Sequence, residues 1–129
     1  MDVMKKINLL NTYVNNVSMQ DTTFAIEVMI HADKKSYVVA VNVDVIMKIE
    51  QDTLLKELTD KADMVLVDGK PLLWISKIHK KPIKAKISGS DLVPRICEIS
   101  AKKGYTMFIL GGMDGIAEKD KKRLEKKLH

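Results

Sequence analysis

The chain has 129 residues, of which 46% are hydrophobic and 30% charged, a balance typical of one globular domain with a single core. No apolar run is long enough to span a bilayer, and the opening residues lack the pattern of a signal peptide. The single cysteine, Cys97, excludes an intramolecular disulfide and a Cys-based zinc cluster, and it suits a reducing compartment. We therefore expect a cytoplasmic protein.

Lysines dominate the formal net charge of +5 and collect in two stretches, 77–86 and 119–127. Aromatic residues do not alternate with these lysines, so the sequence lacks the stacking platform of single-strand nucleic-acid binders, and we expect no nucleic-acid partner. Both stretches are interpreted first as solvated faces. Attraction to anionic phosphates or to a membrane surface is the alternative.

The first third of the chain predicts two strands, a helix and a third strand. Apolar runs at 6–10 and 13–17 indicate the two short strands. Ser18-Met-Gln-Asp21 fits a capping box with Asp in place of Glu, and a broad apolar stripe follows it to about residue 32. The β-branched run 37–41 predicts a buried strand.

The middle of the chain predicts helices on either side of a strand. Residues 45–58 have helical spacing with a break near Asp52, and 64–67 form an apolar strand. Pro71 opens another predicted helix, at a position where a helix tolerates proline. Lys80-Lys81-Pro82 signals the end of that helix.

The last third predicts a short extended segment, a helix, a strand and a charged helix. The helix at 92–103 is preceded by a turn and N-cap and is followed by a C-cap glycine, Gly104. The other expected segments are 83–87 (extended), Gly89-Ser90-Asp91 (turn and N-cap), 106–110 (strand), Gly111-Gly112 (turn) and 115–128 (charged helix).

Strands that alternate with helices, each strand nearly all apolar, predict an α/β fold. We expect residues 1–129 to form one domain with a mostly parallel, Rossmann-like sheet and helices on both faces. Ligands of such sheets bind outside the carboxyl ends of the strands, which selects Asn42, Asp68 and Gly111-Gly112. Asp68-Gly69 is also a common turn pair, so a purely structural turn remains the alternative.

Other kinds of site have less support. Gly111-Gly112 between a strand and a helix could expose backbone N–H groups to a phosphate, or could be only a tight turn. The histidines have no partner at metal-ligand spacing, and no serine has a nucleophile-elbow context, so neither a metal centre nor a hydrolase triad is predicted. A receiver domain would need an acidic pair after the first strand, where this chain has Leu9-Leu10-Asn11-Thr12.

The order and spacing of several segments resemble the WecG/TagA/CpsF glycosyltransferases. These segments are Asn42-Val-Asp-Val-Ile-Met, Ala62-Asp-Met-Val-Leu-Val-Asp68-Gly69, Lys81-Pro82, Gly89-Ser-Asp91-Leu and Phe108-Ile-Leu-Gly-Gly112. The resemblance implies transfer of N-acetylmannosamine or a related sugar from a UDP-sugar to an undecaprenyl-diphosphate-linked sugar. The product would enter wall teichoic acid, enterobacterial common antigen or exopolysaccharide.

The resemblance also implies roles for individual residues. Asp68 matches the family's proposed catalytic base, which would take a proton from the acceptor hydroxyl. Asn42 matches the Asn of a Thr-x-Asn segment whose Thr falls on Ala40, and a family Arg falls on Lys86, which keeps the charge without the bidentate fork. The other positions expected near substrate or nucleotide are Gly69, Gly89, Asp91, Gly111 and Gly112. No metal or other cofactor is implied.

The resemblance covers the chain from about residue 6, and family members continue past the position of His129 into a basic, membrane-docking tail. We therefore expect a form that lacks the C-terminal half. An inactive nucleotide-sugar-binding or interaction domain is the alternative to an active enzyme. An apolar patch exposed where the missing half would pack could drive self-association. Peripheral contact with the inner face of the cell membrane also stays open.

Overall fold

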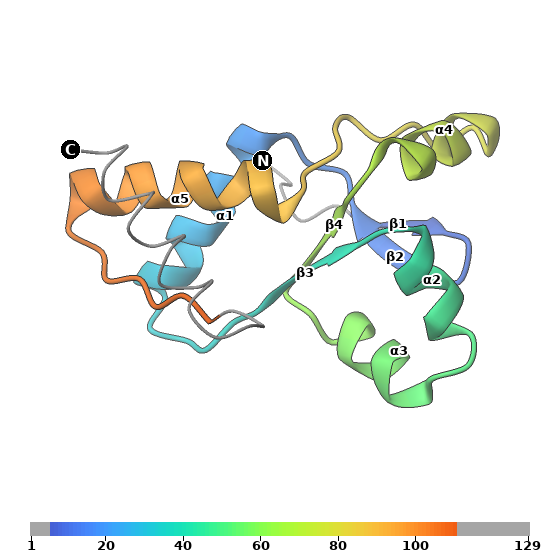
Figure 1. The fold of residues 1–129 in the computed structure, drawn as a ribbon, viewed down its shortest axis with the longest axis horizontal. Helices are drawn as coiled ribbons and strands as arrows, with labels where there is room; N and C mark the ends of the chain where they lie inside the picture. Colours follow the sequence, from blue (N-terminus) through green and yellow to red (C-terminus); the bar gives the residue numbers. More distant parts are fainter. Residues whose placement is uncertain (1–5, 111–129) are drawn as a thin grey trace. The chain divides into compact units, whose positions relative to one another are not determined.

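The computed structural model describes residues 6–110 (Figure 1). Its strands are β1 (Lys6–Leu9), β2 (Thr12–Asn15), β3 (Val38–Val41) and β4 (Met64–Val67). Its helices are α1 (Met19–His31), α2 (Val43–Ile49), α3 (Thr53–Asp60), α4 (Lys70–Ile78) and α5 (Gly89–Lys103). None of these helices is long and apolar enough to cross a membrane. The chain divides into two compact units, the first ending at Gly89 and the second beginning at Ser90.

The strands of the first unit form two pairs. β1 and β2 are an antiparallel hairpin in which Leu9 faces Thr12, while β3 and β4 are parallel, from Val38 opposite Met64 to Val41 opposite Val67. The α/β class is confirmed. The described strands include one parallel pair only, so the mostly parallel, Rossmann-like sheet stays a prediction.

β4 is the central strand of this unit. All of its side chains are buried, and its backbone has partners on both edges. On the edge facing β3, the N–H of Asp68 donates to the carbonyl of Val41 at 2.8 Å. On the other edge, the N–H of Val65 donates to Oδ1 of Asn15 at 2.7 Å, and the carbonyl of Val67 accepts from Ile87 at 2.6 Å. A buried strand with hydrogen-bond partners on both edges is a rigid base for a site.

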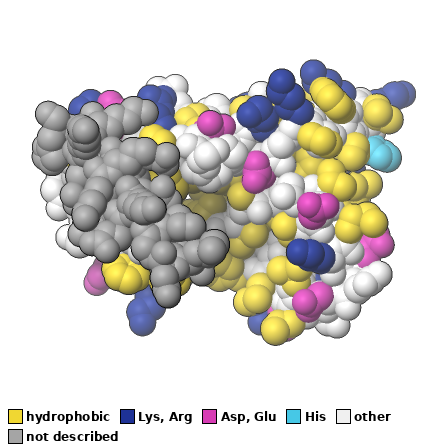
Figure 2. Space-filling model, in the orientation of Figure 1, with side chains coloured by type: hydrophobic (Ala, Val, Ile, Leu, Met, Phe, Trp, Pro, Cys, Tyr) yellow, Lys and Arg dark blue, Asp and Glu magenta, His cyan; other side chains and the backbone are white. Residues whose placement is uncertain are grey.

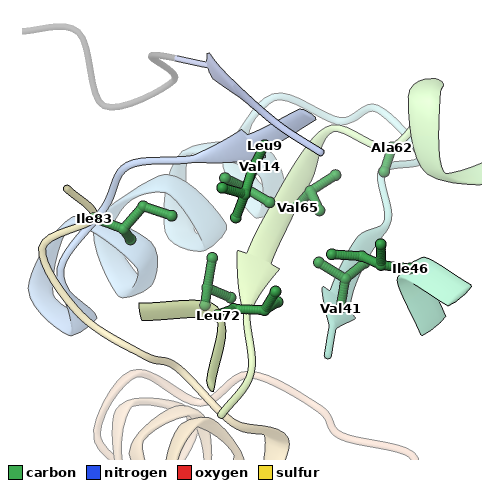
Figure 3. Close-up of a cluster of buried hydrophobic side chains, with 9 residues drawn as sticks. Leu9, Val14, Val41, Ile46, Ala62, Val65, Leu72 and Ile83 are labelled. Carbon is green, nitrogen blue, oxygen red and sulfur yellow. The ribbon is translucent and has the colours of Figure 1, made fainter. Parts of the chain in front are cut away.

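The hydrophobic core of the first unit lies between the hairpin, the parallel pair and the adjoining helices (Figure 3). Burial of these apolar side chains is the main stabilising contribution to the fold. The cluster consists of Leu9 and Val14 from the hairpin, Val41, Val65 and Val67 from the parallel pair, Ile46 from α2, Leu72 from α4, and Ala62 and Ile83 from connecting segments.

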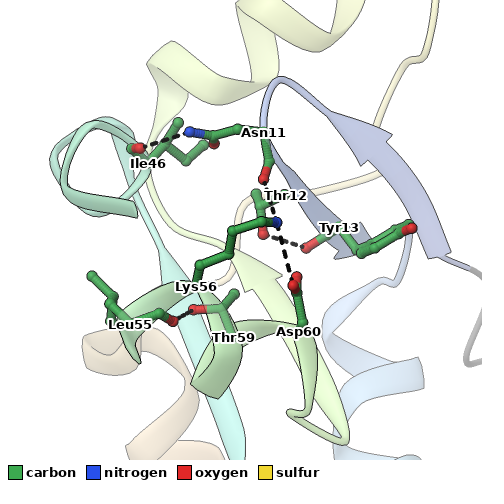
Figure 4. A network of polar contacts seen from close by, with 8 residues as sticks. All are labelled: Asn11, Thr12, Tyr13, Ile46, Leu55, Lys56, Thr59 and Asp60. Carbon is green, nitrogen blue, oxygen red and sulfur yellow. Dashed lines mark hydrogen bonds and ion pairs between the residues drawn. The ribbon is translucent and has the colours of Figure 1, made fainter. Parts of the chain in front are cut away.

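A polar network joins the hairpin turn to α2 and α3 (Figure 4). Nδ2 of Asn11 donates to the carbonyl of Ile46 at 3.2 Å, and Nζ of Lys56 donates to the carbonyl of Asn11 at 3.4 Å. The same Nζ lies 3.3 Å from Oδ2 of Asp60. The hairpin is therefore fixed to the helices by hydrogen bonds as well as by apolar packing.

Local capping chemistry sets the helix starts that the sequence predicted. The capping box at α1 is confirmed: the N–H of Asp21 donates to Oγ of Ser18 at 3.0 Å, and the N–H of Ser18 donates to Oδ2 of Asp21 at 3.1 Å. The second bond is the main reason that the pKa of Asp21 lies below its ordinary value. This stabilisation of α1 is present above the ordinary pKa and is lost as the pH falls through the lowered pKa. The break near Asp52 is confirmed, since Asp52 caps α3.

Several expectations about element type were wrong. Residues 106–110 form no strand, and their side chains include Phe108 and Leu110, each 88% exposed. The predicted buried strand at 37–41 is only partly buried, because β3 has a β-strand neighbour on one side only within residues 6–110. Residues 83–87 form no strand, although Ile87 bonds to β4. The expected helix at 115–128 lies outside the described residues.

Candidate active site

Three segments meet at the carboxyl end of the parallel pair. Val41 and Val67 are in register, so Asn42 and Asp68 follow them at the same edge, as the sequence predicted. The third segment is held there by the hydrogen bond from Ile87 to Val67, and Lys86 directly precedes Ile87. The structure thus brings the neighbourhoods of three residues expected in the site to one place in the fold.

The glycine of the Asp68-Gly69 pair has a structural explanation. Its φ of +101° and ψ of 150° lie in a region that is essentially restricted to glycine. A Cβ there would make only ordinary van der Waals contact with Cδ of Pro71, at 3.6 Å, so backbone conformation and not space requires the glycine. Gly69 occupies the N-cap position of α4 and turns the chain from β4 into that helix.

Asp68 has no such structural task. Its side chain is half-buried, and it makes no hydrogen bond or ion pair to any other residue in the described range. The start of α4 has no side-chain cap at its N-cap position, which Gly69 fills. An aspartate that only served a turn would ordinarily bond to a nearby backbone N–H group. Among the residues that the structure describes, none therefore occupies the carboxylate oxygens of Asp68.

Asn42 is partly committed to the fold. Its Oδ1 accepts a hydrogen bond from the N–H of Val45 at 2.9 Å and caps α2. The amide nitrogen of the half-buried side chain remains a hydrogen-bond donor that could contact a ligand. Ala40, which occupies the position of the expected threonine, is exposed and contributes no polar atom from its side chain. Lys86 is exposed and places a positive charge next to Ile87.

The sequence analysis did not select Lys70, the first residue of α4. It lies two positions after Asp68, and no residue in the first turn of α4 is acidic. The N-terminus of a helix carries a partial positive charge, so acidic residues are the ones usually favoured there. A lysine in that first turn was the signal that could have identified Lys70 as part of an anion-attracting edge.

Gly89, Asp91, Gly111 and Gly112 were also expected near the site. Gly89 and Asp91 lie within the first turn of α5, so the expectation that Gly89-Ser90-Asp91 forms a turn and N-cap before the helix was wrong. Gly89 ends the first unit and Asp91 belongs to the second. Gly111 and Gly112 lie outside the described residues. Within residues 6–110, no group of three or more His, Cys, Asp and Glu side chains could hold a metal ion.

The chain matches a known family. The model of a family described as the glycosyl transferase WecG/TagA/CpsF family matches residues 7–129, which is nearly the whole chain. The matched range includes Asn42, Asp68, Gly69 and Lys86.

Proposed function

This chain belongs to the WecG/TagA/CpsF family of glycosyltransferases, and from this membership we propose that it transfers N-acetylmannosamine or a related sugar from a UDP-sugar. The acceptor is an undecaprenyl-diphosphate-linked sugar, and the product enters a cell-wall or surface polysaccharide. The observation that carries the proposal is the half-buried carboxylate of Asp68 at the carboxyl end of β4, which has no bonding partner among residues 6–110.

In this proposal Asp68 is the general base. Its carboxylate takes the proton of an acceptor hydroxyl while that oxygen bonds to the anomeric carbon of the donor sugar. The bond between the anomeric carbon and the diphosphate oxygen breaks, and its electron pair leaves with UDP. The rigid β4 backbone, bonded on both edges, holds the base at a fixed position during this step.

The negative charge that develops on UDP needs stabilisation by positive groups or hydrogen-bond donors. The candidates at the edge are the amide nitrogen of Asn42, the ammonium of Lys86, and Lys70 with the N-terminus of α4. Gly69, Gly89, Asp91, Gly111 and Gly112 remain proposed positions near the substrate or nucleotide. The proposal includes no metal ion, in keeping with a sequence that has no Asp-x-Asp segment.

The same proposal has consequences for architecture and location. We place β3 and β4 in a larger, mostly parallel, Rossmann-like sheet, supported by their parallel pairing across α2 and α3. A lipid-linked acceptor places the enzyme at the inner face of the cell membrane, on the cytoplasmic side. A homo-oligomer is compatible with this arrangement.

The proposal is tested by replacing Asp68 with Asn and measuring transfer from UDP-N-acetylmannosamine to a lipid-linked acceptor. Asn keeps the shape but cannot accept the proton, so we expect turnover to fall by at least about 100-fold. The matched control is Asp52→Asn, because Asn is as good an N-cap as Asp and Asp52 caps α3. Circular dichroism should show both variants folded.

Two results would count against an active enzyme with this base. Near-normal turnover of Asp68→Asn would remove Asp68 from catalysis. UDP binding by calorimetry without any transfer by the unmodified chain would instead favour a nucleotide-sugar-binding domain. The replacement of the family's Thr and Arg by Ala40 and Lys86 is the feature that would then need explanation.

A further inference from the structure

The segment from Lys70 to Ser88 differs from the rest of the chain in charge. It contains six lysines and no Asp or Glu, a formal +6, whereas the whole chain has a formal net charge of +5. The remainder of the chain is therefore net acidic. Within residues 6–110, positive charge is concentrated in α4 and the loop that follows it.

α4 has an inner and an outer face. Leu72 and Ser76 are buried, with Leu72 in the core cluster. On the outer face, Trp74 is 61% exposed and Ile78 is 77% exposed, and Lys70, Trp74 and Ile78 follow one another at a spacing of four residues. Residues four apart lie on the same side of a helix. The outer face thus combines a large aromatic and an aliphatic side chain with lysines.

The lysines of this segment differ in their side-chain contacts. Nζ of Lys81 donates to the carbonyl of Asn8 at 3.3 Å, and Nζ of Lys84 lies 3.7 Å from Oδ2 of Asp21. Within residues 6–110, no ion pair or hydrogen bond fixes the side chain of Lys70, Lys77 or Lys80. Figure 2 shows hydrophobic and Lys or Arg side chains side by side at the upper right, where Figure 1 shows α4.

We propose that the outer face of α4 docks on an anionic lipid bilayer. We name this surface the α4 face and define it by Lys70, Trp74, Lys77 and Ile78 of the helix and by Lys80, which follows it. Trp favours the boundary between headgroups and acyl chains, and Ile enters the apolar side of that boundary. Each lysine near the surface adds attraction to anionic lipids.

A second copy of this chain fits the α4 face less well than a bilayer. In a symmetric dimer the same patch meets itself, so the unpaired lysines of each copy would approach the lysines of the other. Like charges brought together at an interface oppose association. The apolar part of the patch, the side chains of Trp74 and Ile78, is small for a stable protein interface. Anionic headgroups complement the lysines and also accommodate Trp74 and Ile78.

Docking through the α4 face would also bring the candidate site close to the membrane surface. α4 begins two residues after Asp68, so the carboxyl end of β4 would lie close to the plane of the bilayer. A lipid-linked acceptor presents its diphosphate and sugar at that plane. This consequence rests on the proposed function, whereas the binding to lipid itself does not.

The experiment uses the chain's single tryptophan as the reporter. Vesicles of phosphatidylcholine with phosphatidylglycerol are added to the protein, and vesicles of phosphatidylcholine alone serve as the uncharged comparison. We expect a blue shift of the Trp74 emission and co-flotation of the protein with the anionic vesicles only. Brominated acyl chains should quench the emission, because Trp74 enters the boundary region.

Two double variants separate the effect of the α4 face on vesicle binding from the effect of net charge. Lys70→Glu with Lys77→Glu should lower the partition coefficient for anionic vesicles by at least about tenfold, since two attractive charges become repulsive. Lys35→Glu with Lys48→Glu changes the net charge by the same amount at exposed lysines on other elements. This control should leave vesicle binding nearly unchanged. Both variants keep Trp74 as the reporter.

The outcomes distinguish this proposal from the proposed function. No emission shift with anionic vesicles, or an equal loss in both double variants, overturns the docking surface. A dimer in sedimentation velocity that Ile78→Ser converts to a monomer overturns it as well, because a second copy then covers the patch. Vesicle binding without sugar transfer supports the surface and contradicts the enzyme. Transfer to a detergent-dispersed acceptor without vesicle binding supports the enzyme and contradicts the docking surface.

Discussion

β3 and β4 are both short apolar strands, they pair in parallel, and yet they differ in burial. β4 is buried at each of its four residues, whereas in β3 only Val41 is fully buried and Ala40 is exposed. β4 has hydrogen-bond partners on both edges, and β3 has a strand partner on one edge within the described range. The comparison teaches that an apolar run does not determine its own burial, because the number of neighbouring elements decides it.

The two faces of the pair make the difference sharper. On one face, Val41, Val65 and Val67 belong to the core cluster, and Val39 packs against it while only partly buried. On the opposite face, Met64 and Leu66 of β4 are fully buried, whereas their partners in β3, Val38 and Ala40, are not. Side chains alternate between the faces of a strand, and β3 is less buried than β4 on both faces, because Val39 on the core side is also only partly buried.

The largest expected effect on the free energy of unfolding comes from truncating a buried side chain of β4. Leu66→Ala removes a fully buried side chain and should lower the free energy of unfolding by about 3 kcal/mol. Val38→Ala, on the same face of β3, should cost less than about 1 kcal/mol because Val38 is only half-buried. Urea denaturation of both variants checks this. Equal losses would show that β3 is covered on that face.

A smaller effect is expected from the edge of β4 that β3 does not cover. Asn15→Ala removes the acceptor for the buried N–H of Val65 and should cost about 2 kcal/mol. The control is Asn16→Ala, because Oδ1 of Asn16 accepts from the N–H of Lys84, an exposed residue that water can reach. That control should cost clearly less. Similar midpoints in urea for the two variants would contradict the central position of β4.

The smallest effect is expected at Ala40. Ala40→Thr places a β-branched residue on an exposed position of a strand and should change the free energy of unfolding by less than about 0.5 kcal/mol. The midpoint of thermal unfolding is a sufficient measurement. A loss well above this value would indicate that the Ala40 side of β3 is packed against another part of the protein, and the contrast with β4 would disappear.

Sequence reasoning succeeded where the cause of a structure is local. The capping box of Ser18 and Asp21, the cap at Asp52 and the glycine after α5 were all predicted, and Gly104 indeed has a φ of +76°. The bounds of β4 were also predicted correctly. Each of these features depends on side-chain or backbone chemistry within a few residues, so the neighbouring sequence contains the information.

Sequence reasoning failed where a partner is distant in the chain. The run 106–110 is apolar except for Thr106, but it forms no strand in the described structure, since a strand requires hydrogen-bond partners from elsewhere. The start of α5 was placed three residues too late. For the site, the order of motifs predicted Asp68 and Asn42, but not that Asn42 caps α2 while the carboxylate of Asp68 has no structural partner in the described range.

The sequence by itself determined the helix caps, the strand that ends at Asp68, the glycine that must follow it, and the family to which the chain belongs. The tertiary structure decided which apolar run became the central strand of the first unit. It also decided that the Asp68 side chain at the end of that strand has no bonding partner within residues 6–110. It also decided that Trp74, Ile78 and the lysines of α4 point away from the core. The physical reason is that the hydrogen bonds of caps and turns come from neighbours in sequence. The burial of a side chain, and whether its polar atoms find a partner, depend on residues far away in the chain.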